Sequence, residues 1–193
     1  MYDAFIELIR PVPLLFYIFA YGLSATPTSY LVLKIIHKRE FSKRESHAHS
    51  ATYLWQTAAR WSAILVFALD LLKGLIPCAI ALSLEVPLEA IAMIGFFSVL
   101  GHCFSLWLGF SGGNGGVTAA GSMLIIFWPA AIANFTTNAL LILIGSRPAL
   151  ASVIGSLVGA CVIFGGLKNK VVWLVVAAMV MAIVIRHLSF RQR

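Results

Sequence analysis

The sequence predicts an all-α integral membrane protein with about seven transmembrane helices, some of them short or broken. Hydrophobic residues make up 61% of the 193 residues and charged residues only 11%. Mean hydropathy is +0.95, and apolar runs recur along the whole chain. A soluble globule of this length needs more polar surface than such a composition supplies. We therefore expect one domain over residues 1–193, embedded in a lipid bilayer.

Five apolar runs are long enough to cross a bilayer as single helices, which takes about 20 residues each. In chain order they cover residues 12–36, 61–82, 90–110, 149–167 and 170–186. Residues 117–144 are ambiguous, because as one helix they would extend roughly 42 Å, long for one crossing and short for two. Pro129 lies inside this segment and can break it into two short helices.

The placement of basic residues predicts the topology, since Lys and Arg are enriched in cytoplasmic loops. Basic residues crowd segment 34–44 and the C-terminal tail, whereas segment 83–89 carries only acidic charges. These segments fit seven crossings, with the N-terminus outside and the C-terminus cytoplasmic, if residues 117–144 cross twice. Lys168 and Lys170 then fall outside, against the rule. A single crossing by residues 117–144 would keep them inside but place the basic tail outside.

The formal net charge of +7 is concentrated on the predicted inner face, where anionic headgroups and acidic metabolites are found. Nucleic acid is not an expected partner, because the basic residues are not interleaved with exposed aromatic residues. The three cysteines stand alone within apolar segments, so neither a disulfide nor a metal framework is implied. No cofactor is expected, and the sequence gives no indication of oligomeric state.

A glycine-rich loop, GFSGGNGG, precedes the apolar segment that begins at Val117. Glycines leave no Cβ to block a ligand, so consecutive backbone N–H groups can cradle a phosphate. A helix starting directly after the loop would present its N-terminus to the same anion. The alternative is a tight turn or close helix packing, for which glycine is also typical in membranes.

Several ionisable residues lie in or beside the predicted spans. Asp70 and Lys73 are three residues apart in an apolar helix, a spacing that predicts an ion pair orienting this helix, with direct substrate contact as the alternative. His102 is expected to pack against a loop or to approach a substrate. His187, beside Arg186, either complements a helix C-terminus or binds an anion.

No Ser-His-Asp triad or pair of catalytic carboxylates is visible in the loops predicted to be cytoplasmic. His47 and His49, with Glu45, have a spacing that metal ligands can use, but a polar loop needs no metal to explain them, and we expect none. If the chain is an enzyme, electrostatic positioning of its substrates is the expected mechanism.

Three motifs in order resemble the bacterial PlsY-type membrane acyltransferases: DLLKGLIP at 70–77, GHCF at 101–104 and GFSGGNGGVTAAG at 109–121. That family moves an acyl chain from acyl phosphate to the 1-hydroxyl of glycerol 3-phosphate, as a step of phospholipid synthesis in the bacterial inner membrane. The resemblance implies a seven-helix fold with a cytoplasmic-side cavity for acyl phosphate and for glycerol 3-phosphate or a related acceptor.

The resemblance also implies roles for individual residues. Ser46 and His187 would contact substrate at the catalytic centre, while Asp70, Lys73 and His102 would be structural or support that centre from behind. The residues implied in binding substrate or phosphate are Gly112, Gly113, Asn114, Gly115, Thr118, Arg186 and Arg60.

The sequence departs from the family pattern at four positions expected to hold the two phosphates. The family's arginine falls on Gln56, although Arg60 follows one helical turn later. Its phosphate-binding lysine falls on Asn114, its substrate-side serine on Ala149 and its asparagine on Phe190. Each loss of a charged hydrogen bond to phosphate costs about 1.5–3 kcal/mol.

Two alternatives to an active acyltransferase follow from these observations. One is a non-catalytic family member that binds an anionic lipid or a membrane partner in the same cavity. The other is a small transporter or channel, with Asp70, Lys73 and the region near Pro129 lining a pathway. The absence of an apparent inverted repeat counts against the transporter.

Overall fold

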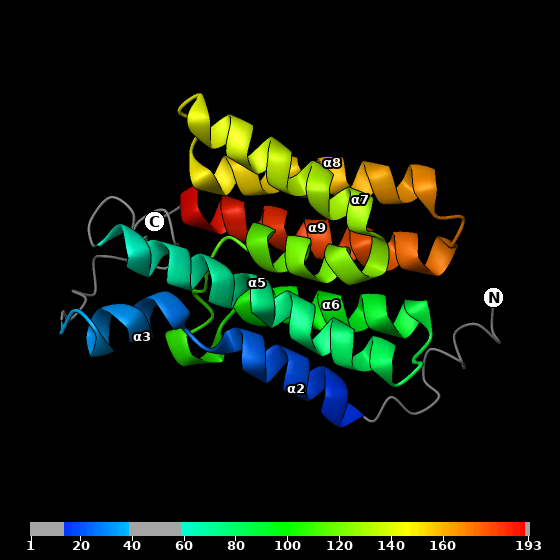
Figure 1. Cartoon of the computed structure of the whole chain (residues 1–193), viewed down its shortest axis with the longest axis horizontal. Coiled ribbons are helices and arrows are strands. Elements are labelled where there is room, and N and C mark those ends of the chain that lie inside the picture. The colour runs from blue at the N-terminus through cyan, green and yellow to red at the C-terminus, as the bar shows by residue number, and fades with distance from the viewer. Residues whose placement is uncertain (1–13, 39–58, 192–193) are drawn as a thin grey trace.

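The computed structural model describes residues 14–38 and 59–191, whose regular elements are all helices. The elements are α2 (Leu14–Ala25), α3 (Thr28–Ile35), α5 (Arg60–Ser83), α6 (Leu88–Cys103), the 3-10 turn η1 (Leu106–Leu108), α7 (Gly116–Leu143), α8 (Pro148–Gly166) and α9 (Lys170–Arg191). Figure 1 shows them side by side along the long axis of the molecule. The predicted all-α class is confirmed.

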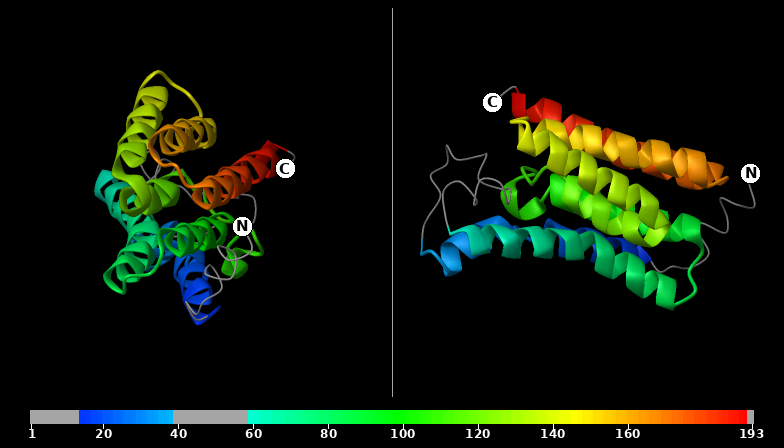
Figure 2. Two further views of the ribbon diagram at one scale, coloured as in Figure 1. Left: turned by 90° about the vertical axis from the view of Figure 1, so that its right-hand side faces the viewer. Right: turned by 45° about the horizontal axis from the view of Figure 1, so that its top comes forward.

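Five helices, α5 to α9, are long and apolar enough to cross a membrane. The shorter apolar helix α2 runs beside them, and successive segments alternate in direction (Figures 1 and 2). Large apolar side chains such as Leu143, Leu174 and Trp128 are 81%, 72% and 63% exposed, as expected on a surface that faces lipid. The chain is therefore a multi-pass integral membrane protein.

The first predicted span, residues 12–36, is divided in the structure. Helix α2 ends at Ala25 and α3 begins at Thr28, with Pro27 between them. Proline has no backbone N–H to donate into a continuing helix. The break leaves Thr26 and Thr28 facing the neighbouring helix α5, where both contact a buried lysine.

Helix α7 contains the break that Pro129 predicts. The backbone is extended at Phe127, with φ −163° and ψ 94°, so Pro129 falls in the first turn of a new helical segment, where its missing N–H costs nothing. The second half then runs back toward the end from which the first half started (Figures 1 and 2). Residues 117–144 thus fold as two short helices, which completes seven crossing segments.

The helices pack through small residues as well as large apolar ones. A Cβ on Gly74 of α5 would collide with the Thr118 carbonyl of α7, and one on Gly121 of α7 would collide with the Leu71 carbonyl of α5. In lipid there is no hydrophobic force between helices, so such close backbone approach supplies much of the packing energy. It brings the middle of α5 directly against the N-terminal half of α7.

Candidate functional site

A buried polar cluster joins α5 to the break between α2 and α3. Lys73 Nζ lies 2.9 Å from Asp70 Oδ1 and donates hydrogen bonds to the Thr26 carbonyl at 2.7 Å and to Thr28 Oγ1 at 3.0 Å. The Thr28 hydroxyl in turn donates to Asp70 Oδ1 at 2.6 Å. Asp70 and Lys73 are 5% and 6% exposed. The predicted ion pair is confirmed, and each charge has polar partners, as a buried pair requires.

Pro77 adds a further contact to this cluster. It lies inside α5 and cannot donate to the carbonyl of Lys73 four residues earlier. The Ser24 hydroxyl of α2 donates to that carbonyl at 3.2 Å instead. The proline therefore creates an acceptor that helps to hold α2 against α5.

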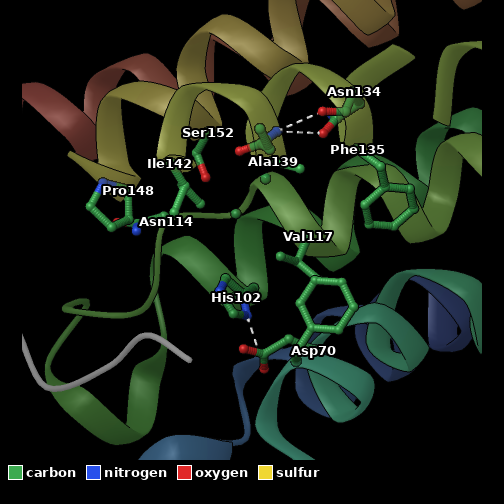
Figure 3. Close-up of a pocket in the computed structure, with 14 residues that line it drawn as sticks. Asp70, His102, Asn114, Val117, Asn134, Phe135, Ala139, Ile142, Pro148 and Ser152 are labelled. Atoms are coloured by element: carbon green, nitrogen blue, oxygen red, sulfur yellow. Dashed lines mark hydrogen bonds and ion pairs between the residues drawn. The ribbon is translucent and has the colours of Figure 1, made fainter. Parts of the chain in front are cut away.

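His102, at the end of α6, connects the cluster to the glycine-rich loop. Its Nδ1 lies 3.6 Å from Asp70 Oδ1, and its ring is almost buried (Figure 3). Its carbonyl accepts a hydrogen bond from the Gly113 N–H at 2.9 Å. A Cβ on Gly113 would collide with the imidazole Nε2, so only glycine fits beside this ring. His102 and Gly113 are thus held together through both backbone and side chain.

The glycine-rich loop is fixed from two sides. The Gly112 N–H donates to the Cys103 carbonyl at 3.0 Å, and the Gly112 carbonyl accepts two bonds from the Arg186 guanidinium of α9, at 3.2 and 2.7 Å. Arg186 is only 5% exposed. Gly115 has φ +80° as the residue preceding α7. Arg186 therefore holds the backbone of the loop in place.

The first turn of α7 leaves backbone donors unused. Within the described part of the chain, the N–H groups of Gly116 and Val117 make no hydrogen bond to protein, as is usual for the first turn of a helix. These donors and the helix dipole favour an anion at this position. The predicted helix start after the loop is confirmed.

A cavity of about 370 Å³ opens beside this helix end. Figure 3 shows Asn114 and Pro148 at one end, Asn134 and Phe135 at the other, and the Asp70–His102 contact along one wall. The lining residues come from α5, α6, the loop, both halves of α7, and α8: Phe67, Asp70, His102, Asn114, Gly115, Gly116, Val117, Asn134, Phe135, Asn138, Ala139, Ile142, Pro148 and Ser152. The cavity thus has a polar end at the loop and mixed apolar and amide walls further in.

A family model described as "Glycerol-3-phosphate acyltransferase" matches residues 14–193. The chain belongs to the glycerol-3-phosphate acyltransferase family. A family member from Bartonella henselae (strain Houston 1) is 31% identical over 147 residues, which cover 75% of this chain and 70% of that protein. "Glycerol-3-phosphate acyltransferase 4" of Dehalococcoides mccartyi (strain 195) is 32% identical over 162 residues, 83% of this chain and 88% of that protein.

Crystal structures of PlsY, an integral membrane glycerol 3-phosphate acyltransferase, share the fold. The glycerol 3-phosphate form is 27% identical with a TM-score of 0.78 and covers 93% of this chain and 90% of that chain. The lysophosphatidic acid form has the same coverage and identity and a TM-score of 0.79. The sequence motifs predicted that the chain resembles the PlsY-type acyltransferases, and these comparisons confirm that prediction.

The residues implied by the family pattern occupy different positions around the cavity. Asp70, His102, Asn114 and Gly115 line it. The other loop and helix residues support the lining from behind: Gly112, Gly113 and Arg186 through the contacts of the loop, Lys73 through Asp70, and Thr118 through a 2.9 Å bond from its hydroxyl to the Asp70 carbonyl. Lys73 contacts Asp70 from behind, whereas Asp70 and His102, also expected in a supporting role, line the cavity themselves, and the roles of all three stay predictions.

Three other implied residues do not join this group. His187 is not among the lining residues, and its Nδ1 is buried without a hydrogen-bond partner in the described part of the chain. Arg60 is exposed at the first residue of α5. Ser46 lies outside the described residues, as do Gln56 and the His47–His49 pair.

Ser152 is a cavity residue that the sequence comparison missed. Ala149 lacks the hydroxyl expected of the family's serine, but Ser152 lies on the same face of α8 one turn later and lines the cavity, 6% exposed. A Cβ on Gly116 would collide with its Oγ, so the hydroxyl sits directly beside the start of α7. Position 149 carries no hydroxyl, as expected, and Ser152 supplies a different hydroxyl to the cavity.

Asn134 and Asn138 were also missed. They lie four residues apart in the second half of α7, and their side chains hydrogen-bond inside the membrane region, with Asn138 Nδ2 at 2.8 Å from Asn134 Oδ1. Two amides one turn apart in an apolar helix are a recognisable signal, because polar groups are expensive in lipid. Only the fold shows that both line the same cavity as the glycine-rich loop.

Proposed function

We propose that this chain transfers a fatty acyl chain from acyl phosphate to the 1-hydroxyl of glycerol 3-phosphate, or of a related acceptor, in phospholipid synthesis. The observation that carries the proposal is the unpaired N-terminus of α7, which faces a cavity that is polar near the loop and has mixed apolar and amide walls further in. Such a cavity fits a donor that is itself an anion joined to an apolar chain. Family membership and the likeness to PlsY support the same assignment.

In this proposal the phosphate of the donor binds at the start of α7. The N–H groups of Gly116 and Val117 and the hydroxyl of Ser152 donate to its oxygens, while the acyl chain extends toward Phe67 and Phe135. The acceptor hydroxyl oxygen attacks the carbonyl carbon, the bond from that carbon to the phosphate oxygen breaks, and the hydroxyl proton ends on the released phosphate. The products are the 1-acyl ester and inorganic phosphate. The helix N-terminus stabilises the negative charge that develops on the leaving group.

The proposed mechanism needs no side-chain nucleophile. The cationic side chains that touch the loop and the cluster, Arg186 and Lys73, bond to the Gly112 carbonyl and to Asp70. They keep the α7 N-terminus and the α2–α3 break in fixed positions, which is a contribution through preorganisation. Ser46 and His187 remain proposed substrate contacts on the strength of the family pattern alone.

We also propose that the loop end of the bundle faces the cytoplasm of a bacterial inner membrane. The loop, α3 and the end of α9 lie at one end of the bundle, and the start of α2 lies at the other (Figure 1). The loop end carries Lys34, Lys38, Arg60 and Arg186, in accord with the positive-inside rule. Cysteine introduced at Glu85 should react with an impermeant maleimide on intact cells, and cysteine at Trp107 only after permeabilisation. The reverse pattern would reject this orientation.

The activity is tested by acyl transfer from palmitoyl phosphate to radiolabelled glycerol 3-phosphate with the purified protein in detergent. Ser152→Ala should lower the rate by about 10-fold, the value of one hydrogen bond to a charged group. Ser83→Ala removes an exposed hydroxyl that bonds to the Ile80 carbonyl at the end of α5, and should leave the rate unchanged. Folded protein that forms no product at any substrate level would reject the proposed reaction and favour lipid binding without turnover.

A further inference from the structure

One polar acceptor in the cavity has no role in the proposed reaction. Asn138 lines the cavity, and its Nδ2 donates to the Asn134 carbonyl at 2.9 Å and to Asn134 Oδ1 at 2.8 Å. Both protons of that amide are therefore used within α7. No described residue donates a hydrogen bond to Asn138 Oδ1, which is left as an acceptor.

The orientation of this amide is fixed by its neighbours. Both partners of Nδ2 are oxygens, so exchanging the nitrogen and oxygen of Asn138 would set oxygen against oxygen. A Cβ on Gly155 of α8 would collide with Nδ2, so the amide packs directly against the backbone of α8 in this position. Asn134 is itself 1% exposed and donates to Ser156 Oγ at 3.4 Å. The acceptor is thus part of a built network.

The cavity that Asn138 lines also has apolar side chains on its walls. They belong to Phe67, Phe135, Ala139 and Ile142. Asn138 is half-buried, and its amide oxygen is open to the cavity. It can therefore accept a hydrogen bond from a hydroxyl group of a bound molecule in place of water.

The position along the cavity points to the acyl chain as the source of that hydroxyl. Ser152 lies beside the α7 N-terminus, whereas Asn138 packs against Gly155, about 4.5 Å further along α8 at 1.5 Å per residue. A donor whose phosphate binds at α7 passes Asn138 with the first carbons of its chain. We infer that Asn138 is a specificity residue that selects acyl chains bearing a hydroxyl group within a few carbons of the reacting carbonyl.

This inference rests on the proposed acyl transfer, and competition between donors tests it. Equal amounts of 3-hydroxypalmitoyl phosphate and palmitoyl phosphate are offered to the wild-type protein, and the two ester products are quantified by mass spectrometry. The hydroxylated product should dominate by about 2- to 13-fold, the net value of one neutral hydrogen bond. A ratio at or below one for both 2-hydroxy and 3-hydroxy donors would overturn the inference while leaving acyl transfer intact.

Variants assign the effect to the amide. Asn138→Leu should bring the product ratio to about one, whereas Thr136→Val, on the same half-helix with an exposed hydroxyl bonded to the Ile132 carbonyl, should keep the wild-type ratio. An unchanged ratio in Asn138→Leu would overturn the inference. The inference would also be overturned if removal of the 2-hydroxyl from the acceptor lowered the rate of the wild type but not that of Asn138→Leu. The hydroxyl that bonds to Asn138 would then belong to the acceptor and not to the acyl chain.

A binding measurement separates failure of the inference from failure of the proposed reaction. If the protein turns over neither donor, the affinities of 3-hydroxypalmitoyl and palmitoyl lysophosphatidic acid are compared by tryptophan fluorescence in detergent. Tighter binding of the hydroxylated lipid by the wild type, lost in Asn138→Leu, would support the inference without turnover. Equal affinities would overturn it.

Discussion

Replacing the charges of Asp70 and Lys73 singly and together tests whether the buried cluster holds α5 against the α2–α3 break. In Asp70→Leu the cluster loses the contact to Lys73 at 2.9 Å and the bond from Thr28 at 2.6 Å. At about 1.5–3 kcal/mol for each bond to a charged group, the loss is about 3–6 kcal/mol. Lys73 keeps its bonds to Thr26 and Thr28, so we expect the lower end of this range.

Lys73→Met should cost a similar free energy of unfolding, because it leaves the Asp70 carboxylate buried without its cation. The double variant removes both charges, and replacing a buried pair by apolar residues of similar size is often nearly neutral. We therefore expect the double variant to lose less than about 2 kcal/mol, well below the sum of the single changes. The measurement is unfolding in mixed micelles of sodium dodecyl sulfate and dodecylmaltoside, followed by circular dichroism.

A control separates the cluster from the general effect of losing a lysine. Lys34 lies 5.5 Å from the centre of the Tyr30 ring on an exposed part of α3, so Lys34→Met should cost less than about 1 kcal/mol. Single variants at Asp70 and Lys73 that each lose less than about 1 kcal/mol, and whose effects add, would refute the reasoning. The cluster would then be a set of contacts without mutual dependence.

Three further predictions concern the loop and the cavity. Arg186→Met should raise the KM for acyl phosphate at least about 10-fold, because the Gly112 carbonyl of the loop loses two bonds to a charged donor. Arg186→Lys should recover part of the loss, and equal KM values for the wild type and Arg186→Met would contradict this prediction. Gly113→Ala should abolish acyl transfer, because the added methyl group collides with His102. Gly22→Ala is the control, since its added methyl group meets no atom within 4 Å, and equal activities of the two variants would show that the loop tolerates displacement. Asn114→Lys should lower the KM for acyl phosphate by about 10-fold in low salt and less in high salt, and a salt-independent effect would exclude direct charge pairing.

Much of the fold followed from the lengths of apolar runs and the positions of prolines. Pro129 predicted the break in α7 because a proline inside a helix removes a donor and clashes with the preceding turn. The same argument applied to Pro27 would have divided the first predicted span. Residues 12–36 were instead interpreted as one helix, because their apolar run is long enough to cross a bilayer. The amino-acid composition shows only that the segment is apolar. The break between α2 and α3 depends on the hydrogen bonds that Thr26 and Thr28 make to α5, which composition does not contain.

The site was predictable only where its residues lie close together in the sequence. The loop and α7 start form one motif, and the Asp70–Lys73 pair has helical spacing, so both could be identified directly. Asn138 and Ser152 meet the cavity because the second half of α7 folds back and α8 packs beside it. No local pattern contains that arrangement, since it depends on the reversal at Phe127.

The family pattern contains charged residues of two kinds, those that bond to the protein itself and those that face the ligand, and the structure distinguishes them. Asp70, Lys73 and Arg186 match the family pattern, and each bonds to protein: the first two to one another, and Arg186 to the loop backbone. Asn114, where the pattern has a lysine, lines the cavity instead. Charges that hold the backbone in place cannot be exchanged without cost to the fold, whereas a charge that faces the ligand can be exchanged at a cost to affinity alone. The seven-segment fold can therefore persist in this chain while its preference for donor and acceptor shifts.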